Sequence, residues 1–203
     1  MKFKAAILEN INQPLLIDEI ENDMLTEGQV LIKILQTGVC RSQVFEMEGQ
    51  RGLDKYLPHL LGHEGCATVI TVGPVVKTVS EGDLVVLHWR RGAGIQSETP
   101  KYIWKGTKVN AGWVTTFNKY AIISENRCTS IPSDTDKELA ALFGCAITTG
   151  FGVINNDSNL KLGQSVIILG LILGISPCKF IINLGLRSKC FSKTSNIRSV
   201  PVW

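Results

Sequence analysis

Three short stretches of the chain carry side chains that could together perform metal-assisted redox chemistry. The first is Cys40-Arg41-Ser42, which places a thiol, a cation and a hydroxyl on consecutive residues. A thiolate binds a metal ion, a guanidinium holds a phosphate, and a hydroxyl carries a proton. The others are Gly62-His63-Glu64 and the segment 144–150, which contains Cys145. Two thiolates and one imidazole, each near a turn-forming glycine, predict a metal site.

Composition limits the classes of function that the chain could have. Its 203 residues suffice for one large domain, or for one domain and part of another. The 21 lysines and arginines are spread out, and the net charge is only +3, so the basic stripe typical of a nucleic-acid-binding surface is missing. Glu9 interrupts the N-terminus before a signal-peptide core could form, which predicts a cytoplasmic protein.

The six cysteines are therefore expected in a reducing compartment. There they are metal ligands or buried thiols more often than disulfides. Cys66 and Cys128 are interpreted as small buried apolar residues. His59 and His88 are interpreted as structural or solvent-facing residues.

The first 130 residues have the pattern of β structure. Short runs rich in β-branched residues are separated by glycine turns at residues 27–29, 72–74 and 81–83. Many short strands with turns at this spacing predict a closed or half-closed barrel. The predicted strands are Val30–Leu35, Ala67–Val72, Leu84–Leu87 and Tyr120–Ile123.

Helical signals follow the predicted barrel. Residues 133–136 are typical of a helix start, and 137–143 contain helix formers with an acidic residue in the first turn. Cys145 is expected at the end of that helix, and a second helix is expected over 148–155. Residues 165–170 then form a buried strand that ends at Gly170, which is how a dinucleotide-binding fold begins.

The dinucleotide pattern stops inside the phosphate turn. Residues 170–175 read Gly-Leu-Ile-Leu-Gly-Ile, with bulky Ile172 where G-x-G-x-x-G requires glycine. Only 33 residues follow Gly170, and no Asp or Glu follows Asp157 to hold a ribose. A strand-helix-strand unit alone takes roughly 30 residues, so a complete nucleotide domain is not expected in this chain.

The motifs 40–42, 62–64 and 144–150, in this order and over this β pattern, resemble the zinc-dependent alcohol dehydrogenases of the medium-chain dehydrogenase/reductase superfamily. The resemblance covers residues 1 to about 170. It implies a mainly β GroES-like barrel, followed here by the incomplete start of an α/β Rossmann domain. The expected domains are 1–138, the GroES-like catalytic domain; 139–174, linking helices and first Rossmann strand; and 175–203, a tail of the kind that truncation or a frameshift produces.

The resemblance also implies roles for individual residues. Cys40, His63 and Cys145 would bind one catalytic zinc, a Cys₂His set for which alcohol dehydrogenase is the standard example. The other implied roles are Glu64 beside the metal, Ser42 as proton relay, Arg41 at the cofactor pyrophosphate, Thr149 at the nicotinamide, Gly170 in the phosphate turn and Trp89 at the substrate. NAD or NADP would be the cofactor, and an alcohol, aldehyde or ketone the substrate.

The sequence departs from the family pattern at two further places. Gln43 stands where many relatives carry Asp, and a neutral amide orients a ligand imidazole but makes it less basic than a carboxylate does. Segment 89–112 contains no cysteine, whereas relatives with a structural zinc place four there. No structural zinc is therefore expected.

These features predict an alcohol dehydrogenase-like oxidoreductase that is impaired by the missing cofactor domain, and a family-type homodimer is doubtful. One alternative is a non-catalytic zinc-binding GroES-like module. A zinc-free quinone-reductase-like protein is disfavoured, because it would not use the Cys₂His set. A membrane-anchored form is a further alternative, since residues 166–186 are largely apolar. Pro177 and Lys179 within that stretch oppose it.

Overall fold

The computed structural model describes residues 1–157, 165–171, 178–183, 187–191 and 197–200. The chain divides into two compact units, Met1–Gly150 and Phe151–Trp203, which are treated separately below.

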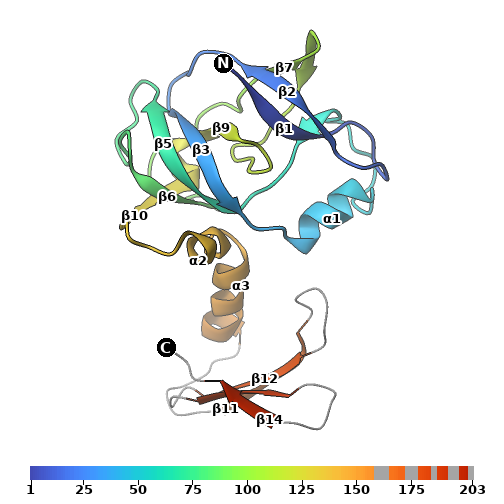
Figure 1. Cartoon of the computed structure of the whole chain (residues 1–203), viewed down its shortest axis with the longest axis vertical. Coiled ribbons are helices and arrows are strands. Elements are labelled where there is room, and N and C mark those ends of the chain that lie inside the picture. Colours follow the sequence, from blue (N-terminus) through green and yellow to red (C-terminus); the bar gives the residue numbers. More distant parts are fainter. Residues whose placement is uncertain (158–164, 172–177, 184–186, 192–196, 201–203) are drawn as a thin grey trace. The chain divides into compact units, whose positions relative to one another are not determined.

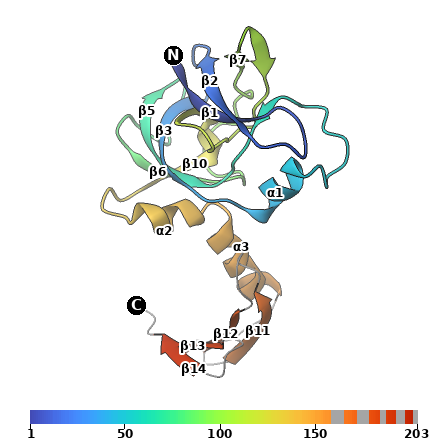
Figure 2. The same ribbon diagram turned by 45° about the vertical axis from the view of Figure 1, so that its right-hand side comes forward.

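The first unit is built from two five-stranded antiparallel sheets (Figures 1 and 2). One has the strand order β4-β1-β2-β7-β8 and the other β10-β6-β5-β3-β9. The strands of the first sheet are β1 Lys2–Leu8, β2 Leu16–Asn22, β4 His59–Leu60, β7 Tyr102–Trp104 and β8 Thr107–Val109. Those of the second are β3 Gln29–Thr37, β5 Gly65–Val72, β6 Leu84–Leu87, β9 Tyr120–Ser124 and β10 Cys128–Ile131.

All four strands predicted in this region are present, and their bounds differ from the prediction by two residues at most. β6 matches exactly, because all four of its residues are buried and apolar. β3 is an interior strand of its sheet, pairing with the central strand β5 on one side and with the edge strand β9 on the other. It carries the chain directly to the segment that begins at Gly38.

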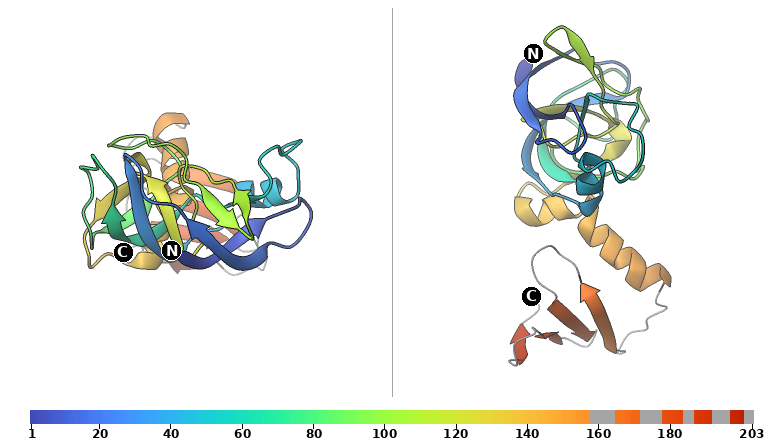
Figure 3. Two further views of the ribbon diagram at one scale, coloured as in Figure 1. Left: turned by 90° about the horizontal axis from the view of Figure 1, so that it is seen from above. Right: turned by 90° about the vertical axis from the view of Figure 1, so that its right-hand side faces the viewer.

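Burial explains why the two sheets hold together. One apolar cluster joins residues of both sheets, among them Phe3, Ile20 and Tyr102 of the first and Leu31 and Ile122 of the second. A second cluster lies on strands of the second sheet. Figure 3 gives the same strands from above and from the side. The mainly β, barrel-like prediction is confirmed.

Short helices complete the described part of the chain, and α2 contacts strands β3, β5 and β6. α1 spans Arg41–Met47, and α2 spans Lys137–Leu142 and begins at Asp136, whose carboxylate accepts the Leu139 N–H at 2.9 Å. α3 spans Ala146–Gly152, the π-helical turn η2 spans Val153–Asp157, and the 3₁₀ turn η1 spans Glu125–Arg127. Both predicted helices are therefore present. Cys145 lies in the turn before α3 rather than at the end of α2.

The second unit contains one sheet of order β11-β12-β13-β14, in which every pair is antiparallel. Its strands are Ser165–Leu171, Cys178–Asn183, Arg187–Phe191 and Ile197–Val200. β11 matches the predicted strand, and Gly170 lies inside it. Only six residues separate β11 from β12, which suits a hairpin, whereas a parallel pair needs a crossover of a dozen or more. The predicted domain boundaries remain predictions.

The apolar stretch 166–186 lies partly outside the described residues. Its described parts belong to β11 and β12. Within the described parts of the chain, no helix has both the length and the apolar character needed to cross a membrane.

Candidate metal centre

Cys40 is positioned by the junction between β3 and α1. It is the N-cap residue of α1, with extended backbone angles, and its carbonyl accepts the Gln43 N–H at 3.0 Å. Its side chain makes no capping hydrogen bond, and its sulfur instead accepts from Cys145 Sγ at 3.9 Å. The start of α1 therefore fixes the position of the sulfur without using it as a hydrogen-bonding cap.

His63 lies in the turn that leads into β5, and Gln43 holds its ring. The Gln43 amide nitrogen is 3.1 Å from His63 Nδ1, while its Oε1 accepts the Gly62 N–H in a short hydrogen bond. Gln43 is buried, so both bonds are shielded from water. The predicted role of this amide, orienting the imidazole, agrees with these contacts.

Glu64 positions Cys145. Its carboxylate accepts the Ala146 N–H at 3.0 Å, and its carbonyl accepts the Thr37 hydroxyl at 3.0 Å. Gly144 fits against it so closely that an added Cβ would lie 2.8 Å from Glu64 Cβ and would overlap the Leu87 carbonyl. The glycine and the buried carboxylate together fix the turn that carries the thiol.

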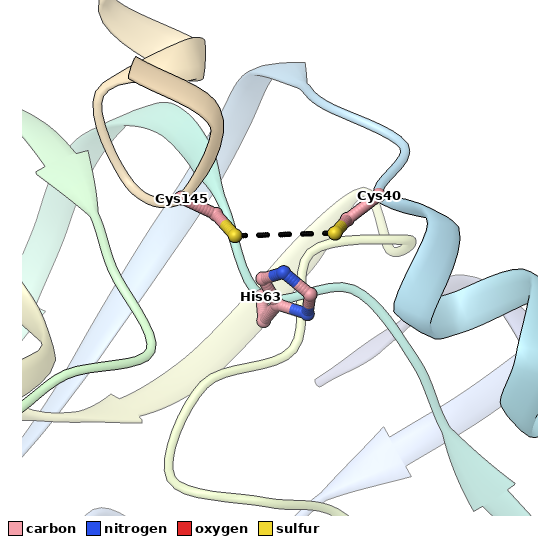
Figure 4. Close-up of side chains that lie close together, drawn as sticks. All are labelled: Cys40, His63 and Cys145. Carbon is pink, nitrogen blue, oxygen red and sulfur yellow. Dashed lines mark hydrogen bonds between the residues drawn. The ribbon is translucent and has the colours of Figure 1, made fainter. Parts of the chain in front are cut away.

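The three candidate ligands, Cys40, His63 and Cys145, converge. One ligand atom from each of Cys40, His63 and Cys145 lies within 4.8 Å of the others, and Figure 4 shows the two sulfurs and the imidazole pointing toward one another. The sulfurs are 3.9 Å apart. Two Zn–S bonds of about 2.3 Å at the tetrahedral angle would place them about 3.8 Å apart. The observed spacing is close to one edge of a zinc tetrahedron.

The electrostatics of the cluster also suit a cation. Burial, followed by the neighbouring Cys40 thiol, raises the pKa of Cys145 to about 11. Burial and then the Arg51 charge lower the pKa of His63, which keeps the imidazole neutral and able to bind a metal. His63 Nε2 is buried and has no hydrogen-bond partner among the described residues. A partnerless ring nitrogen beside two thiols fits a zinc ion when Nδ1 carries the ring proton and the Gln43 amide presents its oxygen to that proton.

A cavity of about 340 Å³ opens at the cluster. Besides the three ligands it is lined by Ser42, Gln43, Arg51 and Trp89. Trp89 is half exposed, and its role at the substrate remains a prediction. No sequence motif includes Arg51, which reaches the wall of the cavity because the loop after α1 carries it there.

Arg41, Thr149 and Gly170 are not among the residues that line this cavity. Arg41 is exposed, and its guanidinium stacks 4.8 Å from the Phe45 ring. Thr149 is exposed on α3, with its hydroxyl 4.0 Å from Cys145 Sγ. Gly170 lies in β11 of the second unit. Their cofactor roles remain predictions. Cys66 and Cys128 are buried in apolar clusters, as interpreted.

Comparison with known proteins agrees with this geometry. Residues 26–133, more than half of the chain, match the alcohol dehydrogenase GroES-like domain. The chain belongs to that family. The S-(hydroxymethyl)glutathione dehydrogenase of Haemophilus influenzae is 30% identical over 196 residues, covering 84% of this chain and 52% of the relative. That of Synechocystis is also 30% identical, over 198 residues, and covers 84% and 53%.

Solved structures give the same assignment for this member of the alcohol dehydrogenase family. An alcohol dehydrogenase zinc-binding domain protein from Burkholderia ambifaria superposes with a TM-score of 0.71 at 25% identity, covering 81% of this chain and 51% of that one. Benzyl alcohol dehydrogenase from Acinetobacter calcoaceticus shares the fold, with a TM-score of 0.67 at 22% identity over 81% of this chain and 50% of the other. The chain thus spans about half the length of the relatives that it matches.

Proposed function

We propose that this chain carries the zinc-binding half of an NAD(P)-dependent alcohol dehydrogenase that interconverts a small alcohol and its aldehyde or ketone. The convergence of Cys40, His63 and Cys145 at the mouth of a cavity is the observation that supports it most. The family supports the same chemistry, because two thiolates and one imidazole leave one coordination position for a substrate oxygen.

Each residue around the cavity has a distinct task in this proposal. Cys40, His63 and Cys145 would hold zinc, with Gln43 fixing the imidazole. When bound, zinc supplies Lewis-acid polarisation of a substrate oxygen, and NAD(P) accepts the hydride. The Ser42 hydroxyl, which faces the same cavity, would receive the proton of the alcohol and pass it toward solvent. Trp89 would form an apolar wall for the substrate.

The test is an oxidation assay on the purified 203-residue chain with added zinc, NAD or NADP and a panel of alcohols. We expect one zinc per chain at the Cys₂His set and slow turnover that disappears in Cys145→Ser. Slow turnover is expected because positioning a hydride acceptor supplies about 7–11 kcal/mol of a barrier. No parallel α/β sheet that could position a nicotinamide is present among the described residues.

A non-catalytic zinc-binding GroES-like module is the second candidate. The antiparallel pairing of β11 with β12 favours it, because a dinucleotide fold opens on parallel strands. Zinc uptake without any turnover dependent on Cys145 would decide for the module. Rapid turnover would instead contradict the expected impairment.

Zinc affinity is expected to rise with pH, by at least tenfold per unit between about pH 6 and 8. The metal binds thiolates, and the raised pKa of Cys145 means that its proton must be displaced throughout this range. His63 contributes little to the dependence, because its lowered pKa leaves it neutral already. Titration against a chromophoric chelator at several pH values measures the slope. An affinity independent of pH would show that the thiols are not the ligands.

A further inference from the structure

Three other ligand side chains gather outside the Cys₂His cluster. Glu46 on α1, Asp54 in the following loop and His59 in β4 each place a ligand atom within 4.8 Å of the others. His59 Nε2 is 2.8 Å from Asp54 Oδ2 and 3.9 Å from Glu46 Oε1. None of the three belongs to the proposed zinc centre.

The backbone fixes which nitrogen of His59 faces the carboxylates. His59 Nδ1 is 3.1 Å from the Leu60 carbonyl oxygen, an acceptor only, so Nδ1 carries a proton and donates it. In the neutral ring, Nε2 then presents a lone pair to two carboxylates. Histidines that bind metals are typically held in this way, with the other ring nitrogen bonded to a carbonyl.

The charge at this cluster is not balanced by basic side chains. Among the described residues, the only ion-pair partner of Glu46 or Asp54 is His59 itself, and it is shared by both. His59 is only 6% exposed, and the Asp54 and Glu46 side chains are 14% and 28% exposed. Two largely shielded carboxylates around one imidazole require a cation between them, whether a proton or a metal ion.

Hydrogen bonds favour the ionised form of the Asp54 carboxylate. Burial would raise its pKa, but the Tyr56 N–H, which donates to Oδ1 at 2.9 Å, and His59 together lower it. A cavity of about 380 Å³, lined by Glu46 and His59 and also by Gln43 and His63, gives an ion a route to two of the three side chains. Deprotonated ligands and an entry path are two requirements of a metal site.

We propose that Glu46, Asp54 and His59 form a second site, for a divalent transition cation of the zinc type, independent of the Cys₂His centre. Metal–ligand bonds of about 2.1 Å keep neighbouring ligand atoms about 3.0–3.4 Å apart. The observed separations of 2.8 and 3.9 Å lie on either side of this range, so small side-chain movements suffice. One imidazole and two carboxylates leave room for water or a further ligand.

Cobalt(II) titration of the full chain tests the proposal, because the two sites differ in colour. Thiolate ligation gives an intense sulfur-to-cobalt charge-transfer band, and a nitrogen-oxygen site gives only weak visible bands. In the double variant Cys40→Ser/Cys145→Ser, we expect one cobalt to bind without the charge-transfer band. Adding Asp54→Asn or Glu46→Gln should weaken that binding by at least tenfold.

Glu48→Gln is the matched control, since it removes the same charge two residues from Glu46, at an exposed position outside the cluster. It should leave cobalt binding unchanged, and circular dichroism should show that every variant is folded. Absence of cobalt binding in the double cysteine variant would overturn the proposal, and His59 would then be an imidazolium paired with two carboxylates. Equal losses in Glu46→Gln and Glu48→Gln would overturn it too, because they would indicate non-specific attraction of cations.

Discussion

Replacing Cys40 with serine is expected to weaken zinc binding by more than 100-fold. Loss of a residue that only hydrogen-bonds to a metal ligand lowers metal affinity by about 10–100-fold. Cys40 would be a ligand itself, so its loss should lower the affinity further. The hydroxyl of serine stays protonated where the thiol ionises, so it cannot replace the charge that the ion requires. Cys145→Ser should have an effect of the same size, because the two sulfurs are 3.9 Å apart and would share one ion.

Competition with a chromophoric chelator measures this effect, and Cys66→Ala is its control. Cys66 is a completely buried thiol of an apolar cluster, so its removal tests whether loss of any cysteine alters metal content. Alanine is preferred there, because serine would bury a hydroxyl. A Cys40→Ser chain whose zinc affinity stays within tenfold of the original would disprove the Cys₂His centre and with it the proposed function.

Four of the ten strands of the first unit, β3, β5, β6 and β9, could be predicted, because burial leaves a simple apolar pattern in them. β6 is buried along its whole length and reads as a continuous apolar run. β2 was not predicted, because only Ile20 of its seven residues is buried. The other six are exposed or partly exposed and show no two-residue alternation of burial. β7 and β8, with three residues each, are too short to show a period at all. Their pairing depends on partners that are distant in sequence.

In the candidate site, too, residues that belong to a motif were predicted, and those placed only by the fold were not. The candidate ligands were predicted because the residue types and their order resemble a known family, and the structure brings these three side chains together. Arg51 was missed, since a single arginine in a loop carries no motif, and its place in the cavity wall depends on how α1 ends. The contact between the Glu64 carboxylate and the Ala146 N–H joins segments 82 residues apart, which no local pattern predicts.

The second unit differs most from the resemblance. A buried strand ending near a glycine suggested the first strand of a parallel sheet, but β11 pairs antiparallel with β12. The strand itself was predictable from its apolar residues. Its partner was not, because pairing direction is decided by the length and course of the connection rather than by the strand's own sequence.

Alanine at Gly62 is expected to be among the most destabilising single substitutions in the barrel, at about 2–5 kcal/mol of unfolding free energy. Gly62 has φ +92°, a conformation that side chains rarely adopt. A Cβ there would overlap the Thr116 hydroxyl and lie 2.8 Å from the Thr116 backbone nitrogen. Thr116 cannot yield, because it is buried, its N–H donates to the Leu61 carbonyl, and its hydroxyl is 2.7 Å from that of Thr37.

Gly82→Ala separates backbone strain from steric overlap as causes of that loss of stability. Gly82 has nearly the same backbone conformation, φ +88°, but nothing lies within 4 Å of an added Cβ. Backbone strain alone should cost about 1–2 kcal/mol there. Urea unfolding followed by circular dichroism measures both variants. Since Gly62 precedes His63, its variant should also lose zinc affinity, whereas Gly82→Ala should not. Equal losses of stability in the two variants would mean that the turn at Gly62 can open, and that the tight contact with Thr116 does not hold the imidazole in place.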